Sequence, residues 1–280
     1  MTEILKVWQW REALAALVAR NIQVRYKNSA LGFLWSFLNP LTQIIVMTIA
    51  FRYIMNSPIE NFSVHLFAVY LPWLFFQQSL GDGSVCVLEN APLLRKYPFP
   101  RMILPAATIL SNLVHMALGG LVLIAILLYL RVAIRPVLLY VPLFLAVLLV
   151  FLLGLMLMIA VMRMFYEDIR FALEAVLRLW FFLTPLVYNM QQVLDTERLS
   201  LPLKQLYVLL NPVTPLMVGM RAALLEPDQW PPPMPPAPGG LCPGGEFWFY
   251  LTVSALVSLI ALAIGVQVWR KYEWKLPELM

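Results

Sequence analysis

The residue types that most often carry out catalysis or bind metals are few in this chain and lie far apart. The two histidines, His65 and His115, lie in or beside different hydrophobic segments, and no zinc-binding spacing is present. The two cysteines, Cys86 and Cys242, are separated by several hydrophobic segments, so a disulfide between them would have to cross a bilayer. We predict no metal centre, and we expect His115 to form a hydrogen bond inside a helix bundle.

The sequence contains no nucleotide site of the usual kind. The phosphate-binding pattern G-x-x-x-x-G-K-[ST] occurs nowhere in the 280 residues, so the chain lacks the loop that holds ATP phosphates in P-loop proteins. We predict that the chain is not an enzyme, has no cofactor of its own and takes energy from another chain. The net charge of +5 comes largely from cations beside hydrophobic segments, so it predicts no nucleic-acid partner.

Two charged residues lie inside a hydrophobic segment, Phe171–Tyr188. Glu174 precedes Arg178 by four residues, which places both side chains on one face of a helix and favours an ion pair. An unpaired charge in lipid is costly, so we predict that this intramembrane pair has a structural role. A contact with cargo or with a second copy of the chain is the alternative.

A basic segment with four prolines, ENAPLLRKYPFPRMILP, occupies Glu89–Pro105. The prolines enclose a short piece that can form a helix, which Asn90 could cap. Arg95, Lys96 and Arg101 give this piece an exposed basic surface. An ordinary positively charged loop would explain the charge but not the repeated proline.

A second polar turn, RMFYEDIR, occupies Arg163–Arg170. Its two acids, Glu167 and Asp168, are flanked by arginines, so they could pair locally or reach a partner.

These polar groups lie among long hydrophobic segments. Hydrophobic residues make up 61% of the chain and charged residues 12%, a composition typical of membrane proteins. A helix needs about 20 apolar residues to cross the hydrocarbon core. We predict an all-α integral membrane protein with six transmembrane helices, at Phe33–Met55, Leu66–Ser84, Ile103–Leu130, Pro136–Met162, Phe171–Tyr188 and Phe247–Trp269.

Lysine and arginine gather on alternate connections between these spans. Placing the N-terminus inside puts most of the twenty cations in the cytoplasm, so we predict a multi-pass protein of the inner or plasma membrane with both termini cytoplasmic.

The N-terminal segment mixes charged and apolar residues and is not expected to be a cleaved signal peptide. Apolar residues from Trp10 to Ile22 recur at helical spacing, with Arg20 on the opposite side. They predict an amphipathic helix in the headgroup layer, or one packed on the protein itself.

The segment Asn189–Glu246 is predicted to lie outside the membrane. Its first half is apolar but is interrupted by Pro202, Pro212 and Pro215, which predicts one or two short helices dipping into the outer leaflet or packed over the bundle. Its second half is rich in Pro and Gly and predicts an irregular, semi-extended excursion.

Polar side chains interrupt the first predicted span at Asn39, Thr42 and Gln43. Polar groups at that depth must face protein or water, so we predict that they face a conduit or the seam of a dimer. Pro40 and Pro185 are expected to bend the first and fifth spans.

Five segments in order resemble one protein family. They are LVARNIQVRYKNSALGFLWSFLNPL, LPWLFFQQSL, LLRKYPFPRMILP, YEDIR followed by LRLWFFLTPLVY, and LNPVTPLMVGMRAALL. This series resembles the membrane permease of bacterial type-2 ABC exporters, which move cell-surface polysaccharides such as O-antigen or teichoic acid. The resemblance runs from Leu17 to Leu225 and, more loosely, through the final span.

The resemblance implies a half-transporter. Two copies of this chain would form a homodimer that binds two copies of a separate cytoplasmic ABC ATPase, which would hold ATP and Mg. In such permeases an N-terminal interface helix, here Glu3–Ile22, and a coupling helix, here Asn90–Arg101, meet the ATPase. Short gate helices would lie within Asp195–Leu225. The coupling residues expected on this basis are Asn90, Leu94, Arg95, Lys96, Arg101, Glu167 and Asp168.

The implied cargo is a polysaccharide on an undecaprenyl lipid, which must cross about 30 Å of hydrocarbon without being left in it. The permease itself would contact membrane lipids. Aromatic faces stack on sugar C–H groups without requiring one hydroxyl pattern, although aromatic belts at membrane interfaces give the same sequence pattern. The residues predicted to line a conduit are Asn39, Gln43, Tyr70, Trp73, Phe75, Trp180, Phe181 and Tyr188.

A single transmembrane domain is predicted for residues 1–280. It divides into the interface helix and basic anchor (1–32), five spans (33–188), gate helices and Pro/Gly-rich insert (189–246), the sixth span (247–269) and a cytoplasmic tail (270–280). Two alternative functions remain: a permease for small lipids or drugs, and a membrane-embedded transferase for a polyprenyl-linked sugar.

Overall fold

The computed structural model describes residues 10–25, 27, 29, 31–56, 61–96, 99–131, 136–225 and 230–275. These residues form helices and connections and contain no strand. The α-helices are α2 (Arg11–Arg25), α3 (Trp35–Thr48), α4 (Phe62–Glu89), α5 (Ala91–Lys96), α6 (Ile103–Tyr129), α7 (Val141–Phe165), α8 (Ile169–Leu183), α9 (Met190–Asp195), α10 (Leu201–Leu210), α11 (Val213–Leu225) and α12 (Glu246–Tyr272). Shorter helical pieces are η1 (Gly32–Leu34), the π-helical η2 (Ile49–Ile54), η3 (Pro136–Tyr140), η5 (Pro238–Gly240) and η6 (Glu273–Lys275).

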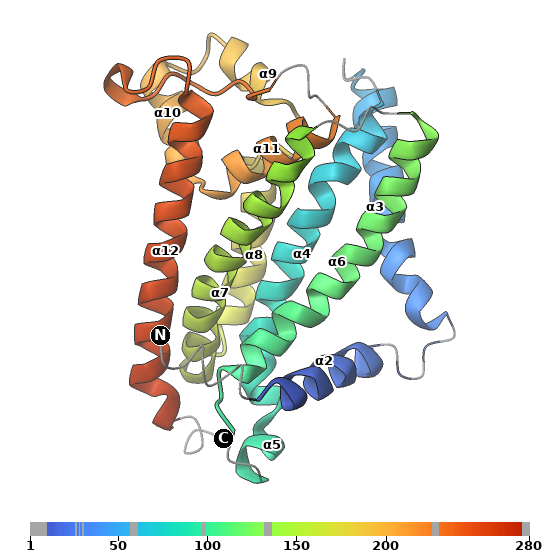
Figure 1. Ribbon diagram of the computed structural model, residues 1–280, viewed down its shortest axis with the longest axis vertical. Helices are drawn as coiled ribbons and strands as arrows, with labels where there is room; N and C mark the ends of the chain where they lie inside the picture. The colour runs from blue at the N-terminus through green and yellow to red at the C-terminus, as the bar shows by residue number, and fades with distance from the viewer. Residues whose placement is uncertain are drawn as a thin grey trace.

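Helix α4 forms the centre of the bundle (Figure 1). It packs against α3, α6, α7, α8 and α11, and most of its side chains are buried by them. Trp73, Phe76 and Leu80 are among its fully buried large side chains. Because neighbouring helices cover α4, it can carry polar residues that would be costly against lipid.

Helices α7 and α12 approach each other closely through two glycines. A Cβ atom added to Gly154 would lie 2.5 Å from the carbonyl carbon of Ala261, and one added to Gly265 would lie 2.3 Å from the carbonyl oxygen of Gly154. Only glycine allows this backbone contact. The pair therefore fixes α12 against the rest of the bundle.

Elements from distant parts of the sequence gather at two ends of the bundle (Figure 1). The first, here called the α2 end, holds α2, α5, the turn Tyr166–Asp168 and the last turn of α12. The second, here called the α10 end, holds α9 and α10, with α11 below them. The connections that the sequence predicts on the inner side of the membrane therefore lie together.

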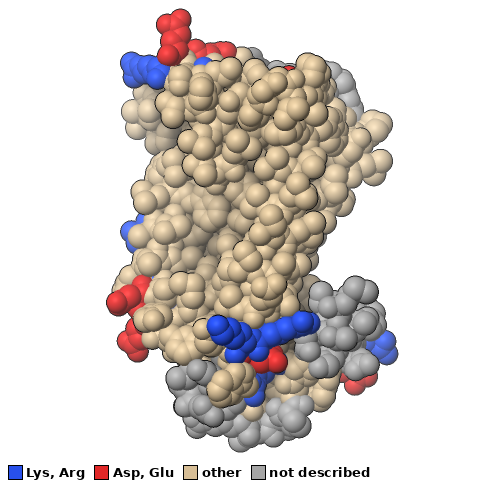
Figure 2. Space-filling view, turned by 90° about the vertical axis from the view of Figure 1, so that its left-hand side faces the viewer, with Lys and Arg blue, Asp and Glu red and all other residues tan. Residues whose placement is uncertain are grey.

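The outer surface of the bundle suits a membrane. Within the described ranges, four helical segments are long and apolar enough to cross a bilayer: Trp35–Ile54, Ile103–Tyr129, Pro136–Phe165 and Glu246–Tyr272. Helices α10 and α11 would together make a fifth, with a bend of 91° between them. Figure 2 shows a broad belt of uncharged side chains, with most charged groups near the two ends. The chain is therefore an all-helical membrane protein.

The two prolines predicted to bend spans behave differently. Pro40 lies inside α3, which continues to Thr48. Pro185 lies outside α8, which ends at Leu183, so the prediction of a bend within this helix is wrong. Thr184 has an extended backbone (φ −103°, ψ 136°), the conformation that a following proline favours, and the helix stops there.

Short helices do form in the first half of Asn189–Glu246, as predicted. There are three among the described residues, α9, α10 and α11, rather than one or two. Helix α11 is not superficial, because Val213–Ala223 is buried and packs against α4 and α7.

The described part of the Pro/Gly-rich insert packs on the bundle rather than extending away from it. The Trp230 ring stacks on Tyr140 with 5.2 Å between centroids. The Pro236 carbonyl accepts hydrogen bonds from Gln205 Nε2 (2.8 Å) and from the Tyr250 hydroxyl (3.3 Å). Through Pro236 the insert therefore contacts both α10 and α12 at the α10 end.

Candidate functional site

Helix α2 is tied to the start of α5 by a side-chain hydrogen bond. Arg20 Nη2 donates to Asn90 Oδ1, and Asn90 Nδ2 donates to the Cys86 carbonyl at 2.7 Å. Asn90 is 6% exposed and uses its amide in these two bonds, which corrects the expectation that it caps α5. Arg20 thus reaches the end of α4 while α2 packs on α6, which agrees with the alternative that this helix packs on the protein itself.

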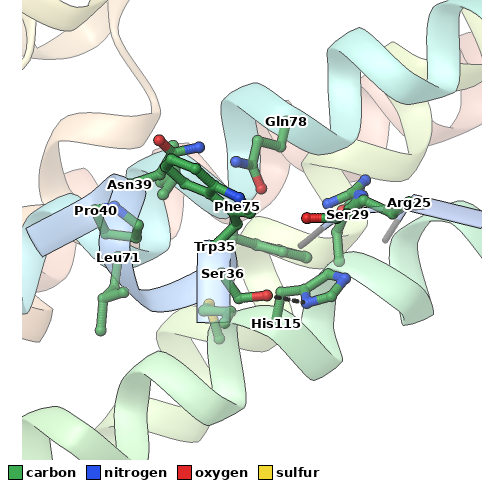
Figure 3. A pocket seen from close by; sticks show the side chains of 13 residues that line it. Arg25, Ser29, Trp35, Ser36, Asn39, Pro40, Leu71, Phe75, Gln78 and His115 are labelled. Atoms are coloured by element: carbon green, nitrogen blue, oxygen red, sulfur yellow. Dashed lines mark hydrogen bonds between the residues drawn. The ribbon is translucent and has the colours of Figure 1, made fainter. Parts of the chain in front are cut away.

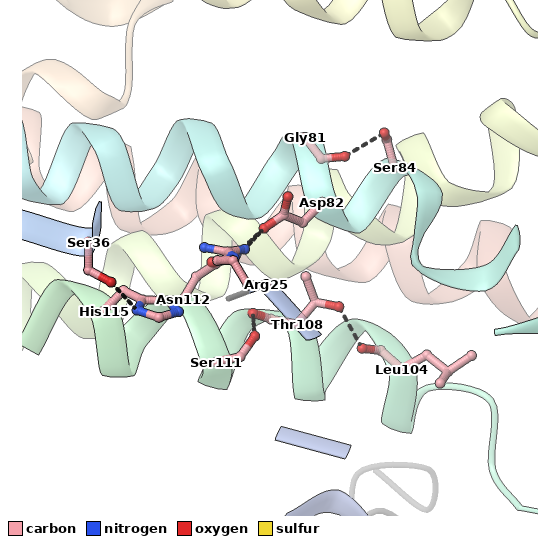
Figure 4. Close-up of polar contacts among 10 residues, drawn as sticks. All are labelled: Arg25, Ser36, Gly81, Asp82, Ser84, Leu104, Thr108, Ser111, Asn112 and His115. Carbon is pink, nitrogen blue, oxygen red and sulfur yellow. Dashed lines mark hydrogen bonds and ion pairs between the residues drawn. The ribbon is translucent and has the colours of Figure 1, made fainter. Parts of the chain in front are cut away.

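A second connection at the α2 end joins three helices (Figure 4). Arg25, the last residue of α2, forms an ion pair with Asp82 of α4. Asn112 of α6 donates from Nδ2 to Asp82 Oδ2 at 3.0 Å. The side chains of Arg25 and Asp82 are 31% and 43% exposed, so water can reach this pair. One carboxylate thus links α2, α4 and α6.

The predicted hydrogen bond of His115 is present beside this connection. Its Nδ1 atom lies 3.3 Å from Ser36 Oγ, which joins α6 to α3 (Figure 4).

The remaining predicted coupling residues lie at the α2 end. Leu94 packs with a small buried cluster that includes Met102 and Trp269, and Arg101 is half-buried just before α6. Arg95 and Lys96 belong to α5, but their side chains fall outside the described part of the structure, as do residues Glu3 to Gln9 of the predicted interface helix.

The acidic turn between α7 and α8 presents its carboxylates to the exterior. Glu167 and Asp168 are exposed and form no ion pair with the described residues. Arg163 instead donates to the Glu167 carbonyl at 2.7 Å. The two carboxylates are therefore available to a partner.

The predicted pair on α8 is present and has a third member. Glu174 lies 3.9 Å from Arg178 Nη2 and 3.3 Å from Arg170 Nε. All three side chains are more than half exposed in the single chain. These charges therefore lie on a face that the chain itself does not cover.

Most of the predicted conduit aromatics are packed inside the single chain. Trp73 is 0% exposed, and its ring contacts Phe181 at 5.9 Å between centroids. Tyr70 meets Phe181 at 6.4 Å, and Phe75 is 2% exposed. In this conformation these four side chains pack α4 against its neighbours.

The polar candidates on α3 have a different environment. Asn39 and Gln43 are exposed, and among the described residues neither forms a hydrogen bond, so both amides are available to other groups.

Trp180 belongs to a buried polar cluster at the α10 end. Its Nε1 donates to Asn211 Oδ1 at 2.9 Å. Asn211 Nδ2 donates to Thr184 Oγ1 at 2.9 Å and to the Leu183 carbonyl at 3.1 Å, and Asn211 Oδ1 accepts from the Val213 amide at 3.2 Å. One amide thus joins the end of α8 to the bend between α10 and α11.

Tyr188 lies in the same region, between α8 and α9. Its hydroxyl donates to the Phe182 carbonyl at 3.0 Å, so the 2.9 Å contact with Tyr207 has Tyr207 as donor. Arg221 of α11 is 3% exposed and donates from Nη1 to the Pro185 and Tyr188 carbonyls, each at 3.2 Å.

Sequence reasoning missed the partners of three residues. Asp82 stands alone in a hydrophobic helix, and such an acid needs a nearby cation, but nothing in the pattern identifies Arg25. Arg221 falls in the segment predicted to lie outside the membrane, and its burial and its contacts with two backbone carbonyls give no sequence signal. Asn211 precedes a proline and gives no sequence sign of its four hydrogen bonds. The site is therefore a set of connections between helices rather than a catalytic cluster.

Comparison with known proteins identifies relatives. The sequence profile of the ABC-2 type transporter family matches residues 12–225. The O-antigen export system permease protein RfbA of Myxococcus xanthus is 33% identical over 224 residues, covering 80% of this chain and 84% of that protein. A protein of the same description from Klebsiella pneumoniae is 22% identical over 272 residues, covering 96% and 95% of the two chains.

Proposed function

The chain belongs to the ABC-2 type transporter family, and we propose that it is the membrane permease of an ATP-driven exporter of lipid-linked polysaccharide. The observation that carries this proposal is the match to the Myxococcus xanthus O-antigen export permease over four fifths of the chain. The cargo proposed for this chain is accordingly an O-antigen-like polymer on an undecaprenyl lipid.

Energy for export would come from a separate ATPase. The chain has no P-loop sequence, so two copies of a cytoplasmic ABC ATPase would hold ATP and Mg. Their proposed docking surface is the α2 end, where α2, α5 and the exposed acids Glu167 and Asp168 lie together. This assignment places the α2 end, and both chain termini, in the cytoplasm.

We assign six spans by adding α4 and α8 to the helices that are apolar by composition. Helix α4 has 28 residues, about 42 Å at 1.5 Å per residue, which exceeds the hydrocarbon thickness of about 30 Å. Its polar residues are compatible with a span because other helices surround it. Helix α8 is shorter, with 15 residues, and α9 to α11 continue from its end as the gate helices. The location would be the inner or plasma membrane.

A second copy of the chain would cover the exposed polar faces of α3 and α8. Both helices pack on α4. Asn39 and Gln43 on α3, and Glu174 and Arg178 on α8, are exposed and would be costly against lipid. A homodimer that encloses these side chains would give the cargo a polar conduit between the copies.

A charge reversal tests the docking surface with a matched control. Glu167→Lys with Asp168→Lys should reduce the amount of co-purified ATPase about tenfold, because like charges at an interface cost binding energy. Asp195→Lys with Glu197→Lys makes the same change at the α10 end and should leave co-purification unchanged. Equal ATPase recovery from both double variants would contradict the assignment.

Export itself is tested in cells that carry the permease and its ATPase. Deletion of the permease should abolish cell-surface polysaccharide, and the native chain should restore it. Restoration of drug resistance instead would favour a small-molecule permease, and sugar transfer by the purified chain alone would favour a transferase.

A further inference from the structure

A cavity of about 250 Å³, lined by both polar and apolar side chains, lies between α3, α4 and α6, beside the end of α2 (Figure 3). Asn39 of α3 and Gln78 of α4 lie above the rings of Trp35 and Phe75 in this view, with Arg25 at one side. All the residues that line the cavity come from one chain, and Asn39 also lies on the exposed face of α3 proposed to meet a second copy.

The cavity lies at membrane depth near the α2 end. Gln78 precedes the end of α4 at Glu89 by eleven residues, about 17 Å along the helix. Asn112 follows the start of α6 at Ile103 by nine residues, about 14 Å along it. Polar groups at this depth are retained where they meet water, protein or a ligand.

Several of these polar groups have unused hydrogen-bonding capacity. Asn112 is 1% exposed and its Nδ2 group bonds to Asp82, so the capacity open to an occupant comes from residues that are less buried. Gln78 and Asn39 form no hydrogen bond with any described residue. The cavity therefore offers amide donors and acceptors to an occupant that carries hydroxyl groups.

Charge and size decide the class of occupant. The charge of Arg25 is already balanced by Asp82, so the cavity has little free positive charge to hold a diphosphate. Trp35 is 45% exposed and provides a flat aromatic surface for the C–H face of a sugar. The volume is below the roughly 300 Å³ at which drug-sized pockets begin, which suits one ring rather than a polymer.

We propose that this cavity binds a single pyranose residue of the cargo, the one next to the lipid. The position favours that residue because its lipid tail can remain in the hydrocarbon while the sugar enters the bundle. The proposal rests on the proposed export of lipid-linked polysaccharide.

The test measures binding to the permease–ATPase complex in lipid nanodiscs. One probe is a short-chain polyprenyl diphosphate carrying one N-acetylhexosamine, and the other is the same diphosphate without sugar. The sugar-bearing probe should bind about tenfold more tightly, since one or two net hydrogen bonds give that difference. Equal affinities would overturn the proposal and point to recognition of the diphosphate or the lipid alone.

Matched variants locate the site. Gln78→Leu should lower the affinity for the sugar-bearing probe about tenfold and leave the sugarless probe unaffected. Gln267→Leu makes the same change on an exposed part of α12 and should alter neither. Asn39→Leu, on a different helix, provides a second variant if Gln78→Leu lowers the melting temperature. Native binding of the sugar probe by both cavity variants would refute the site.

The failure of this inference can be told apart from failure of the proposed function. If the native chain supports polysaccharide export but the two probes bind equally, only the cavity proposal is wrong. If cells show neither export nor ATPase association, the proposed function itself is wrong.

Discussion

The two ends of the bundle are fastened by different kinds of bond. At the α2 end, Arg25 and Asp82 form an ion pair that water reaches. At the α10 end, Asn211 and Arg221 are 5% and 3% exposed and donate to backbone carbonyls. Exposed ion pairs contribute little net stability, whereas a buried polar group is expensive to leave unpaired. The α2 end therefore has, besides the buried Asn90 amide, an ion pair that can be broken and remade, whereas the buried groups of the α10 end resist opening.

This difference agrees with the proposed roles of the two ends. A surface that moves with an ATPase needs contacts that can break and re-form with a small change in free energy. A closure at the opposite end must hold until the whole bundle moves, since an open path would leak ions. Helix α8 reaches both ends, and Asn211 joins its last turn to α10 and α11. Displacement of α8 would thus be transmitted to the gate helices.

The largest expected effect comes from Arg221. Replacing Arg221 by Met keeps an unbranched side chain but leaves the Pro185 and Tyr188 carbonyls without this donor. We expect the free energy of unfolding to fall by about 3 kcal/mol, because hydrogen bonds from charged groups are the stronger ones. Thermal unfolding of the purified protein measures this loss. A loss below about 1 kcal/mol would show that the α10 end is no more firmly fastened than an exposed ion pair.

Asn211→Leu should rank second, with a loss of about 2 kcal/mol, because it leaves the Trp180 indole N–H and other buried groups unpaired. Trp180→Phe should lower the free energy of unfolding by less in the same assay, since it removes the indole N–H and leaves no buried donor unpaired. If Trp180→Phe proved the more damaging, packing rather than the amide would hold this junction.

Tyr207→Phe is a smaller change at the same end. It removes one hydroxyl that donates to Tyr188 and should lower the free energy of unfolding by about 1 kcal/mol. Tyr188→Phe should cost more, because it also leaves the Phe182 carbonyl without its donor. The reverse order in chemical or thermal unfolding would disprove the assigned donor directions.

The smallest effect on stability is expected for the ion pair at the α2 end. A double-mutant cycle with Arg25→Gln and Asp82→Asn should give a coupling energy of about 0.5 kcal/mol that decreases with added salt. Export should nevertheless fall in the single variants, because α2 loses its ion pair with α4 and keeps only the Arg20–Asn90 hydrogen bond there. A coupling above about 3 kcal/mol would remove the distinction between the two ends.

The sequence predicted the helical elements better than the functional side chains. The six hydrophobic segments correspond to α3 with η2, α4, α6, η3 with α7, α8 and α12, and the short helices before the last span were expected. Hydrophobic length and proline positions are local signals, which explains this success. The aromatic residues were harder to assign. Trp73 looks the same in sequence whether it faces sugar, lipid or protein, and only packing shows that it is buried against Phe181.

The sequence by itself determined that this chain is a membrane protein. It also determined the ends of the helices to within a few residues, and which connections between helices lie at the same end of the bundle. These properties depend on the transfer of each segment between water and hydrocarbon, which composition sets. Only the tertiary structure decided that Arg25 meets Asp82, that Asn112 of α6 donates to the same carboxylate, and that Arg221 is buried. Those contacts depend on the rotation and tilt of packed helices, which residues far apart in the chain fix together.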